Sequence, residues 1–482
     1  MPEAMVSQTV DAPPVQARRG LGMLVVMIGV LIAAIDGTIV VLALPAIQHE
    51  LKISLASVTW VVVAYLLVVT VLATQVGRLG DMYGRVRMYE VGFGIFVLGS
   101  VLCAVAWDGP SIIGFRVLQG LGAALVAANS GAVISELYPP EERGRAYGIN
   151  ALGYSLGSVL GVLLGGVIVT YVSWRCIFWI NLPIGLVALV LAALVLRDRG
   201  ERVRRRLDPL GMITLGLGLF AVVWVMTKLA VEPLNAVQVG FLVGGVVLLV
   251  AFVFIELRHK EPTLDLSLFR IPTMVPALVA ALLQNLASFA VLFLVIMYLQ
   301  GPRGLTPIDA SLLMVPGYLI GAITGPYTGR VADRLGPVIP ATAGLGISVI
   351  ALVIFAQMTI TSSLWLPAIG NAVIMVGGSF FYSANSSAVM KAAPAERLGI
   401  ASGVMRTFAS VGMVFSFTLA ILVAAFAIPR STAFAIFVGT ASLHGPAAVA
   451  FTSGVSVAFY TLTGIMVLAA VLSAIRGRAV RA

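Results

Sequence analysis

The sequence predicts an all-α polytopic membrane protein, and three observations lead to this fold class. Of the 482 residues, 60% are hydrophobic and only 10% carry a charge. A water-soluble chain carries roughly 25% charged residues, so this chain lacks the polar surface that a water-facing globule needs. Long apolar runs, each close to the roughly 20 residues that a helix needs to cross a bilayer, follow one another with short polar interruptions. We therefore expect fourteen transmembrane helices and no sizeable domain outside the membrane.

The first part of the chain predicts a tail and a bundle of six helices. Residues 1–20 are polar, contain proline and end in two arginines, and we expect them to form a cytoplasmic N-terminal tail. The apolar run that follows is too long for a signal-peptide core and is interrupted by Asp36. Residues 21–196 then form the N-terminal six-helix bundle, with spans near 21–45, 57–76, 89–107, 111–137, 147–172 and 176–196.

The rest of the chain predicts two inserted helices and a second bundle. A basic loop runs from Arg197 to Asp208, and residues 209–256 hold two transmembrane helices, near 209–230 and 235–256. A second polar loop contains Arg258, Lys260 and Arg270. Residues 273–475 form the C-terminal six-helix bundle, with spans near 273–299, 308–329, 337–358, 364–391, 398–428 and 453–475.

The net charge of +10 is explained by membrane topology, with no nucleic-acid partner. Lysine and arginine are enriched in the cytoplasmic loops of membrane proteins. With fourteen spans and the N-terminus inside, 23 of the 30 lysine and arginine residues fall on the cytoplasmic side. The exceptions are outer-loop or intramembrane residues: Lys52, Arg175, Lys228, Arg303, Arg430, Arg116 and Arg406. Both termini are therefore expected in the cytoplasm.

An internal repeat organises the chain into two parallel halves. The segment Gly77-Arg78-Leu79-Gly80-Asp81-Met82-Tyr83-Gly84 recurs as Gly329-Arg330-Val331-Ala332-Asp333-Arg334-Leu335-Gly336, an offset of 252 residues. Ala128-Asn129-Ser130 is echoed by Ala384-Asn385-Ser386 at an offset of 256. Such repeats are typical of secondary transporters built from related bundles. The offset exceeds six spans because the two helices of 209–256 are inserted between the halves.

Two six-span halves with G-R-x-x-D-x-x-G after the second span of each resemble the major facilitator superfamily. Further segments make the chain similar to its fourteen-span drug:proton antiporter branch: Asp36 to Pro45, Arg116-Val117-Leu118-Gln119-Gly120, a glycine ladder in the fifth span, Ser173-Trp174-Arg175, and Asn181-Leu182-Pro183-Ile184-Gly185. The resemblance implies proton-driven export of lipophilic or amphipathic compounds across the cell membrane by alternating access. It implies a chain that works as a monomer in the lipid bilayer.

Asp36 and Arg116 are the candidate proton-coupling pair. Asp36 lies about fifteen residues into the first span, and an ionisable residue at such depth is a functional hypothesis by default. Arg116 enters the fourth span from the outer side and reaches the same part of the membrane. We expect Asp36 to load and release the coupled proton and Arg116 to bias this equilibrium. The alternative is a static buried ion pair that fixes helix packing.

The repeated cytoplasmic motif predicts a gating latch. In the superfamily this motif holds the cytoplasmic side of the outward-facing state. Its residues here are Gly77, Asp81, Gly84 and Arg85, with Glu136 at the inner end of the fourth span completing a charge cluster. The second copy keeps Asp333 but has Pro337 where Arg85 would fall, which predicts a weaker latch. A topology signal with a turn would explain the arginines but not the repeated aspartate.

Glycines in the fifth span predict close helix packing. Gly153, Gly157, Gly161 and Gly165 recur every four residues and so lie on one helical face. The stripe resembles the antiporter motif, in which a proline usually follows the third glycine, but Val162 stands there. A hinge or seal role beyond packing therefore stays open.

Polar and aromatic residues in the central spans are candidate substrate-cavity contacts, although most such side chains pack or face lipid. They are Gln284, Asn285, Tyr318, Phe381, Tyr382, Arg406 and Phe408. Arg406 lies near the start of the thirteenth span, where it can snorkel to the interface or meet an anionic group. The family carries an arginine in this neighbourhood.

Several function classes are disfavoured by missing motifs. The chain has no G-x-x-x-x-G-K-[ST] loop for ATP and no H-E-x-x-H segment for zinc, so we expect neither a cofactor nor a metal. Three alternatives to export are considered. The first is a proton symporter or facilitator for a small metabolite. The second is a membrane-embedded lipid-modifying enzyme, which would need a catalytic cluster. The third is a non-transporting sensor.

Overall fold

The computed structural model describes residues 15–198, 207–230, 232–259, 264, 266–393, 398–429 and 443–479. These residues form helices and connecting turns, without a β-strand among them. Fourteen of the helices in this part of the chain are long and apolar enough to cross a membrane. The predicted fold class, an all-α polytopic protein with fourteen spans, is therefore confirmed.

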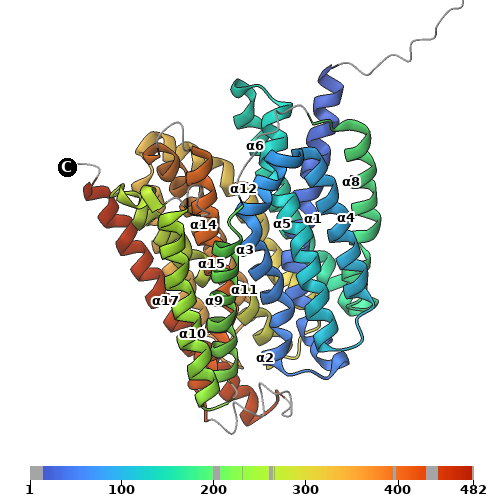
Figure 1. The fold of residues 1–482 in the computed structure, drawn as a ribbon. Coiled ribbons are helices and arrows are strands. Elements are labelled where there is room, and N and C mark those ends of the chain that lie inside the picture. Colours follow the sequence, from blue (N-terminus) through green and yellow to red (C-terminus); the bar gives the residue numbers. More distant parts are fainter. Residues whose placement is uncertain are drawn as a thin grey trace, which may run out of the picture.

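The spanning helices form two bundles that lie side by side (Figure 1). The first bundle contains α1 (Val15–Leu51), α3 (Trp60–Tyr83), α4 (Arg85–Ala104), α5 (Gly109–Leu137), α6 (Pro140–Tyr171) and α8 (Asn181–Val195), with short helices α2 (Leu55–Val58) and α7 (Cys176–Trp179). The second contains α11 (Met274–Gln300), α12 (Pro307–Leu335), α13 (Val338–Ala356), α14 (Trp365–Ala392), α15 (Leu398–Phe426) and α17 (Pro446–Ala479), preceded by the 3₁₀ helix η1 (Leu266–Arg270).

Several helices are longer than the apolar runs that predict them. Helix α1 begins at Val15, inside the segment expected to be the tail, and α6 begins at Pro140 instead of near residue 147. Both extensions are polar, and a helix that leaves the membrane needs no apolar surface to continue. Residues 1–14 lie outside the described part of the chain.

Equivalent glycines end the second spanning helix of each bundle. Gly84 separates α3 from α4 with a φ of 107°, and Gly336 separates α12 from α13 with a φ of 75°. Backbone with positive φ is readily adopted only by glycine, because other residues carry a Cβ atom that clashes there. The repeated motif therefore forms the same kind of turn in both halves.

The inserted helices α9 (Pro209–Leu229) and α10 (Ala236–Arg258) lie on one flank of the molecule. Helix α9 contacts α3 of the first bundle and α15 of the second, so it lies along the seam between them. Helix α10 packs against α9 and leaves a broad apolar face exposed, including Val243, Val247 and Phe254. Such a face is suited to lipid.

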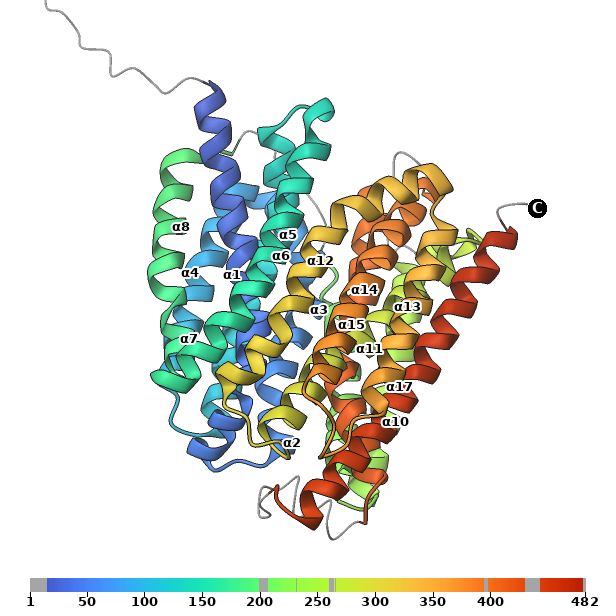
Figure 2. The ribbon, with the colours of Figure 1, turned by 180° about the vertical axis from the view of Figure 1, so that it is seen from behind.

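The two bundles are joined at one end and lean apart toward the end that carries both termini (Figure 2). A single hydrophobic core contains side chains of both bundles, such as Ile39 and Val62 with Phe293 and Met314. Nearer the termini, the first bundle has a core of its own around Tyr89. We call the two ends of the molecule the termini end and the opposite end.

Candidate functional site

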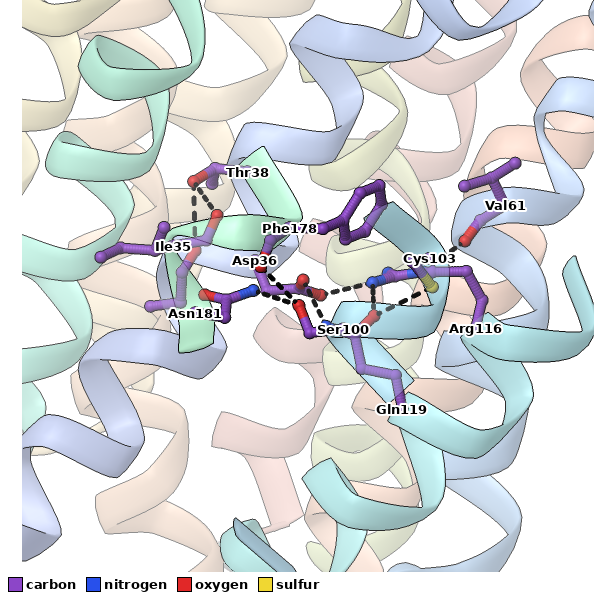
Figure 3. A network of polar contacts seen from close by, with 11 residues as sticks. Ile35, Asp36, Thr38, Val61, Ser100, Cys103, Arg116, Gln119, Phe178 and Asn181 are labelled. Atoms are coloured by element: carbon purple, nitrogen blue, oxygen red, sulfur yellow. Dashed lines mark hydrogen bonds and ion pairs between the residues drawn. The ribbon is translucent and has the colours of Figure 1, made fainter. Parts of the chain in front are cut away.

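Asp36 of α1 and Arg116 of α5 meet inside the first bundle (Figure 3). A terminal guanidinium nitrogen of Arg116 lies 2.7 Å from Asp36 Oδ2. Asp36 is 0% exposed and Arg116 is 1% exposed. Arg116 is seven residues from the start of α5, about 10 Å at 1.5 Å per residue, so the pair lies nearer the opposite end. The structure thus brings together the two residues predicted to couple to protons.

Gln119 completes this pair into a closed network. Its side-chain amide donates to Asp36 Oδ1 over 2.9 Å, and its Oε1 accepts from Arg116 over 2.6 Å. The third residue after Arg116 on a helix faces the same side, so the i, i+3 spacing is the signal that identifies Gln119. Gln119 belongs to a motif of the sequence, but the motif alone indicated no role for it.

Helix α3 holds the guanidinium from its other side. Arg116 Nε donates to the Val61 carbonyl over 2.8 Å, and the guanidinium carbon lies 4.1 Å from the centre of the Tyr65 ring. A cation over an aromatic face is attracted to it, especially away from water. The network therefore connects α1, α3 and α5, and Tyr65 is a further member that the sequence did not reveal.

The binding of one proton would change the net charge of this buried network. Two buried opposite charges are stable together when further hydrogen bonds satisfy them, whereas a lone buried charge is expensive. A proton on Asp36 would remove the negative charge that Arg116 needs and would leave the guanidinium on neutral partners only. Any such change must be answered by movement of α1, α3 or α5, or by entry of water.

Further polar contacts brace this bundle around the network. Asn181 donates to Ser100 Oγ over 2.9 Å, and Ser100 donates to the Phe178 carbonyl over 2.9 Å, which ties α8 and α7 to α4 (Figure 3). At the opposite end, Glu50 accepts from Trp174 and pairs with Arg175 at 3.0 Å. The motif residues from Ser173 to Asn181 thus fix the end of the bundle.

The latch residues of the first repeat form a charge cluster at the termini end. Arg85 of α4 lies 2.9 Å from Asp81 Oδ1 of α3 and 3.2 Å from Glu136 Oε1 of α5. Gly84, the turn residue between α3 and α4, and Gly77, one turn before Asp81, lie on the same segment. The cluster joins three helices of the first bundle, in the arrangement that the sequence led us to expect.

Asp198 is an additional member of this region. Its Oδ1 accepts from the Val86 backbone N–H over 2.8 Å, which caps the start of α4 from the segment that follows α8. A Cβ atom on Gly84 would collide with the Asp198 carboxylate, so this turn and this cap fit one another. In the second repeat Asp333 lies in α12, but its side chain falls outside what the structure describes.

The glycine stripe of α6 packs against α1. Cβ atoms added at Gly157 and Gly161 would lie 2.7 Å and 2.8 Å from the carbonyl oxygens of Leu31 and Ile35. Gly153 and Gly165 face Met27 and Ile39 in the same way. The stripe therefore allows close packing within the first bundle, and its glycines do not face the second.

The neighbouring residue Gly166 makes the contact between bundles. A Cβ atom there would meet the Ser311 side chain and would lie 2.9 Å from the Ile308 Cα of α12. Close by, the Ile308 backbone N–H donates to Thr170 Oγ1 over 3.0 Å, and Gln300 donates to the Leu42 carbonyl over 3.2 Å. These contacts close the opposite end across the seam.

The predicted cavity residues do not form one group. Phe381 is 1% exposed and packed in the core, and the ring centre of Phe408 lies 5.7 Å from that of Phe269 of η1, with the two rings tilted by 46°. Asn285 donates to the Ala281 carbonyl of its own helix. Packing thus accounts for Phe381 and Phe408, while Asn285 is half-buried and bonded within its own helix. Polar or aromatic character alone could not distinguish a core position from an open one.

Among the other cavity candidates, Tyr382 and Arg406 are exposed, Tyr318 is half-buried and Gln284 is buried. Tyr154 of α6 is 48% exposed, and it lies near Tyr318 and Tyr382 of the second bundle. Arg406 of α15 is exposed and donates to the Ala127 carbonyl of α5 over 3.3 Å. Gln284 is 8% exposed and bonds Ser288. Tyr154 was not predicted, because an aromatic residue next to a glycine stripe gave no signal.

Comparison with known proteins identifies the class. The profile of the Major Facilitator Superfamily matches residues 26–417. The tetracenomycin C resistance and export protein of Streptomyces glaucescens is 32% identical over 399 residues, 81% of this chain and 73% of that protein. The probable actinorhodin transporter of Streptomyces coelicolor is 32% identical over 421 residues, 84% of this chain and 72% of that protein. The multidrug resistance protein Stp of Mycobacterium tuberculosis is 32% identical over 394 residues, 81% and 73% of the two chains.

Solved structures show the same fold. A bacterial homologue of the lysosomal transporter Spinster, crystallised in an inward-facing and unoccupied conformation, superposes with a TM-score of 0.70 at 15% identity, covering 97% of this chain and 98% of that one. A D-xylose–proton symporter superposes with a TM-score of 0.61 at 14% identity, covering 91% and 96%. The chain belongs to the Major Facilitator Superfamily. It is a multi-pass transporter, not an enzyme, and its fourteen spans fit the branch that its motifs indicated.

Proposed function

We propose that this protein is a proton-coupled exporter of lipophilic or amphipathic compounds, with Asp36 as the coupling carboxylate. The observation that carries the proposal is the buried network of Asp36, Arg116 and Gln119. A closed network of this kind changes its net charge when one proton binds. The names of the relatives, which include resistance and export proteins, support export as the direction.

The mechanism is alternating access between the two ends of the molecule. In the structure the bundles share a core at the opposite end and have separate cores toward the termini. A substrate entering from the termini end would meet α6, α12 and α14 near Tyr154, Tyr318 and Tyr382. Protonation of Asp36 would release Arg116 and loosen the contact of α1 with α5, which favours rearrangement of the first bundle.

The charge cluster of Asp81, Arg85 and Glu136 acts as the gating latch. It fixes α3, α4 and α5 at the termini end as one unit, so this end can dock on the second bundle in the alternate conformation. Asp333 would play the corresponding part in the second half, more weakly because Pro337 replaces the arginine. The protein works as a monomer in the cell membrane with both termini in the cytoplasm.

Transport in reconstituted vesicles with an imposed pH difference tests the coupling. Ethidium and tetracenomycin C serve as a cationic and an antibiotic probe. Wild-type protein should accumulate at least one of them on the acidic side, since proton flow down its gradient drives the exchange. Asp36→Asn should abolish accumulation while leaving equilibration of the probe down its own gradient. Asp309→Asn, which alters an exposed carboxylate at the start of α12, is the control and should behave as wild type.

The result also separates export from its alternatives. Accumulation of a probe with the proton, on the alkaline side, would indicate a symporter and contradict the proposed direction. Binding without flux would indicate a sensor. If Asp36→Asn accumulates the probe as wild type does, the Asp36 network is a structural ion pair and the coupling proposal is wrong.

A further inference from the structure

A second buried arginine lies in the other half of the molecule. Arg476, near the end of α17, is 1% exposed. One terminal nitrogen donates to Asn385 Oδ1 of α14 over 2.6 Å, and the Asn385 amide donates to the Ala277 carbonyl of α11 over 3.1 Å. Arg476 Nε and its other terminal nitrogen have no hydrogen-bond partner among the described residues.

This arginine differs from Arg116 in one decisive respect. Arg116 is paired with a carboxylate, whereas Arg476 has a neutral amide as its partner in the described chain. A guanidinium stays protonated under all conditions that proteins meet, so the charge cannot be removed by losing a proton. Water could satisfy the free N–H groups but would leave the charge uncompensated. An unpaired buried cation of this kind requires an anion.

The position fits an anion from the membrane surface. Arg476 is three residues before the end of α17, and Ala277 is three residues after the start of α11, about 5 Å from each helix end. Both helix ends lie at the termini end. Exposed cations, Arg330 and Arg334 of α12 and Lys391 of α14, lie near the ends of their helices at this same end. Such a field attracts anions and repels cations.

We propose that Arg476 is the centre of a binding site for a phosphate-type anion at the termini end of the second bundle. The two free N–H directions of its guanidinium match two oxygens of one phosphate, the geometry that arginine provides best. Asn385 positions the guanidinium by accepting from its remaining terminal nitrogen. The phosphate comes either from the headgroup of an anionic phospholipid or from free phosphate, and the chemistry of recognition is the same.

Thermal unfolding of the full-length protein tests the site and its source of phosphate. Wild type and Arg476→Gln are compared in phosphatidylcholine nanodiscs, in the same nanodiscs with phosphatidylglycerol, and in phosphatidylcholine with inorganic phosphate. Phosphatidylglycerol or phosphate should raise the midpoint of the wild type by about 3 °C or more, because a ligand bound only by the folded state stabilises it. Arg476→Gln should lose this rise. A rise with phosphatidylglycerol alone identifies a lipid, and a rise with phosphate identifies the free anion.

Matched variants separate the effect of Arg476 from the loss of a positive charge in general. Arg334→Gln removes an equal charge from the exposed rim of the same end and should retain most of the rise. Native mass spectrometry should show phosphatidylglycerol or phosphate retained about tenfold less by Arg476→Gln than by Arg334→Gln. Arg476→Lys keeps a charge without the paired N–H groups and should show intermediate retention. Equal retention by wild type and Arg476→Gln would overturn the proposal. So would the absence of a rise in the wild type together with its appearance in Asp333→Asn, because the counter-ion of Arg476 would then be internal.

Discussion

Buried polar side chains determine which substitutions the first bundle tolerates. Asp36, Arg116 and Gln119 have almost no exposed surface and satisfy one another's charges and hydrogen bonds. Such groups behave as a unit, so the effect of removing one depends on what the others can still do. A carboxylate can take up a proton, whereas a guanidinium cannot give one up. Removal of Asp36 and removal of Arg116 should therefore have different effects, which can be measured.

Asp36→Leu should destabilise the protein more than Arg116→Leu does. The first change leaves a buried guanidinium without its counter-ion, at a cost of about 3–5 kcal/mol. The second leaves a carboxyl group that can become neutral by binding a proton. Thermal unfolding in detergent of both variants and of the double variant measures the difference. The double variant should be more stable than Asp36→Leu alone, and strict additivity of the two losses would contradict a coupled pair.

Gly84→Ala should lower stability by about 1–3 kcal/mol, because its φ of 107° is unfavourable for alanine. The new methyl group would also displace the Asp198 carboxylate from the start of α4. Gly94→Ala is the matched control, since it lies inside α4 with no other group within 4 Å of the added atom. That control should be neutral or slightly stabilising. Equal midpoints of thermal unfolding for the two variants would count against the strained turn.

Helix α6 has two faces with different partners. Its four-residue glycine stripe packs on α1, while Gly166 packs on α12 across the seam. The spacing of glycines in the sequence identifies the stripe but not its partner. Gly166, which lies outside the stripe, is the glycine of the described part of α6 that closely approaches α12.

Gly166→Val should open the contact between α6 and α12 at the opposite end. The valine side chain would collide with Ser311 and with the backbone of Ile308, so the closed arrangement loses stability relative to the alternative. Spin labels on α6 and α12 should report a population with a longer distance than in wild type. Gly114→Ala, in open space on α5, is the control and should leave the distances unchanged.

At the scale of the whole molecule, the proposed alternating-access mechanism makes this structure one end point of the transport cycle. The shared core and the bonds of Thr170 with Ile308 and of Gln300 with Leu42 close the opposite end. Toward the termini the bundles lean apart (Figure 2). The proposed mechanism requires this closure to break and re-form in every cycle.

A disulfide across the closed end should therefore stop transport reversibly. Thr170→Cys with Ile308→Cys, in a background with Cys103→Ser and Cys176→Ser, places one thiol on each helix beside the point where the Ile308 backbone N–H donates to Thr170 Oγ1 over 3.0 Å. Oxidation should abolish probe flux in vesicles, and dithiothreitol should restore it. Each single-cysteine variant should keep its flux under oxidation. Undiminished flux in the cross-linked protein would show that this contact does not open.

The sequence predicts the fold better than it predicts the contacts between bundles. Apolar runs, loop charges and the repeat are properties of single segments, and they gave the fourteen spans that the structure confirms. The proximity of Asp36 and Arg116 could also be predicted, because both are charged residues at similar depth. The importance of Gln119, Tyr154 and Gly166 could not be predicted, because it depends on which helix faces them across the fold.

The coupling network has a consequence for how such proteins diversify. All of its members belong to α1, α3 and α5, so the residues proposed to respond to the proton lie within one bundle. Of the three tyrosines near which a substrate would enter, Tyr318 of α12 and Tyr382 of α14 lie in the second bundle, whereas Tyr154 of α6 lies in the first. A chimera that joins residues 15–198 to the second bundle of a relative should therefore keep the residues proposed for proton coupling and acquire part of the donor's substrate preference. Proton coupling and substrate preference should thus be separable by exchange of bundles only in part.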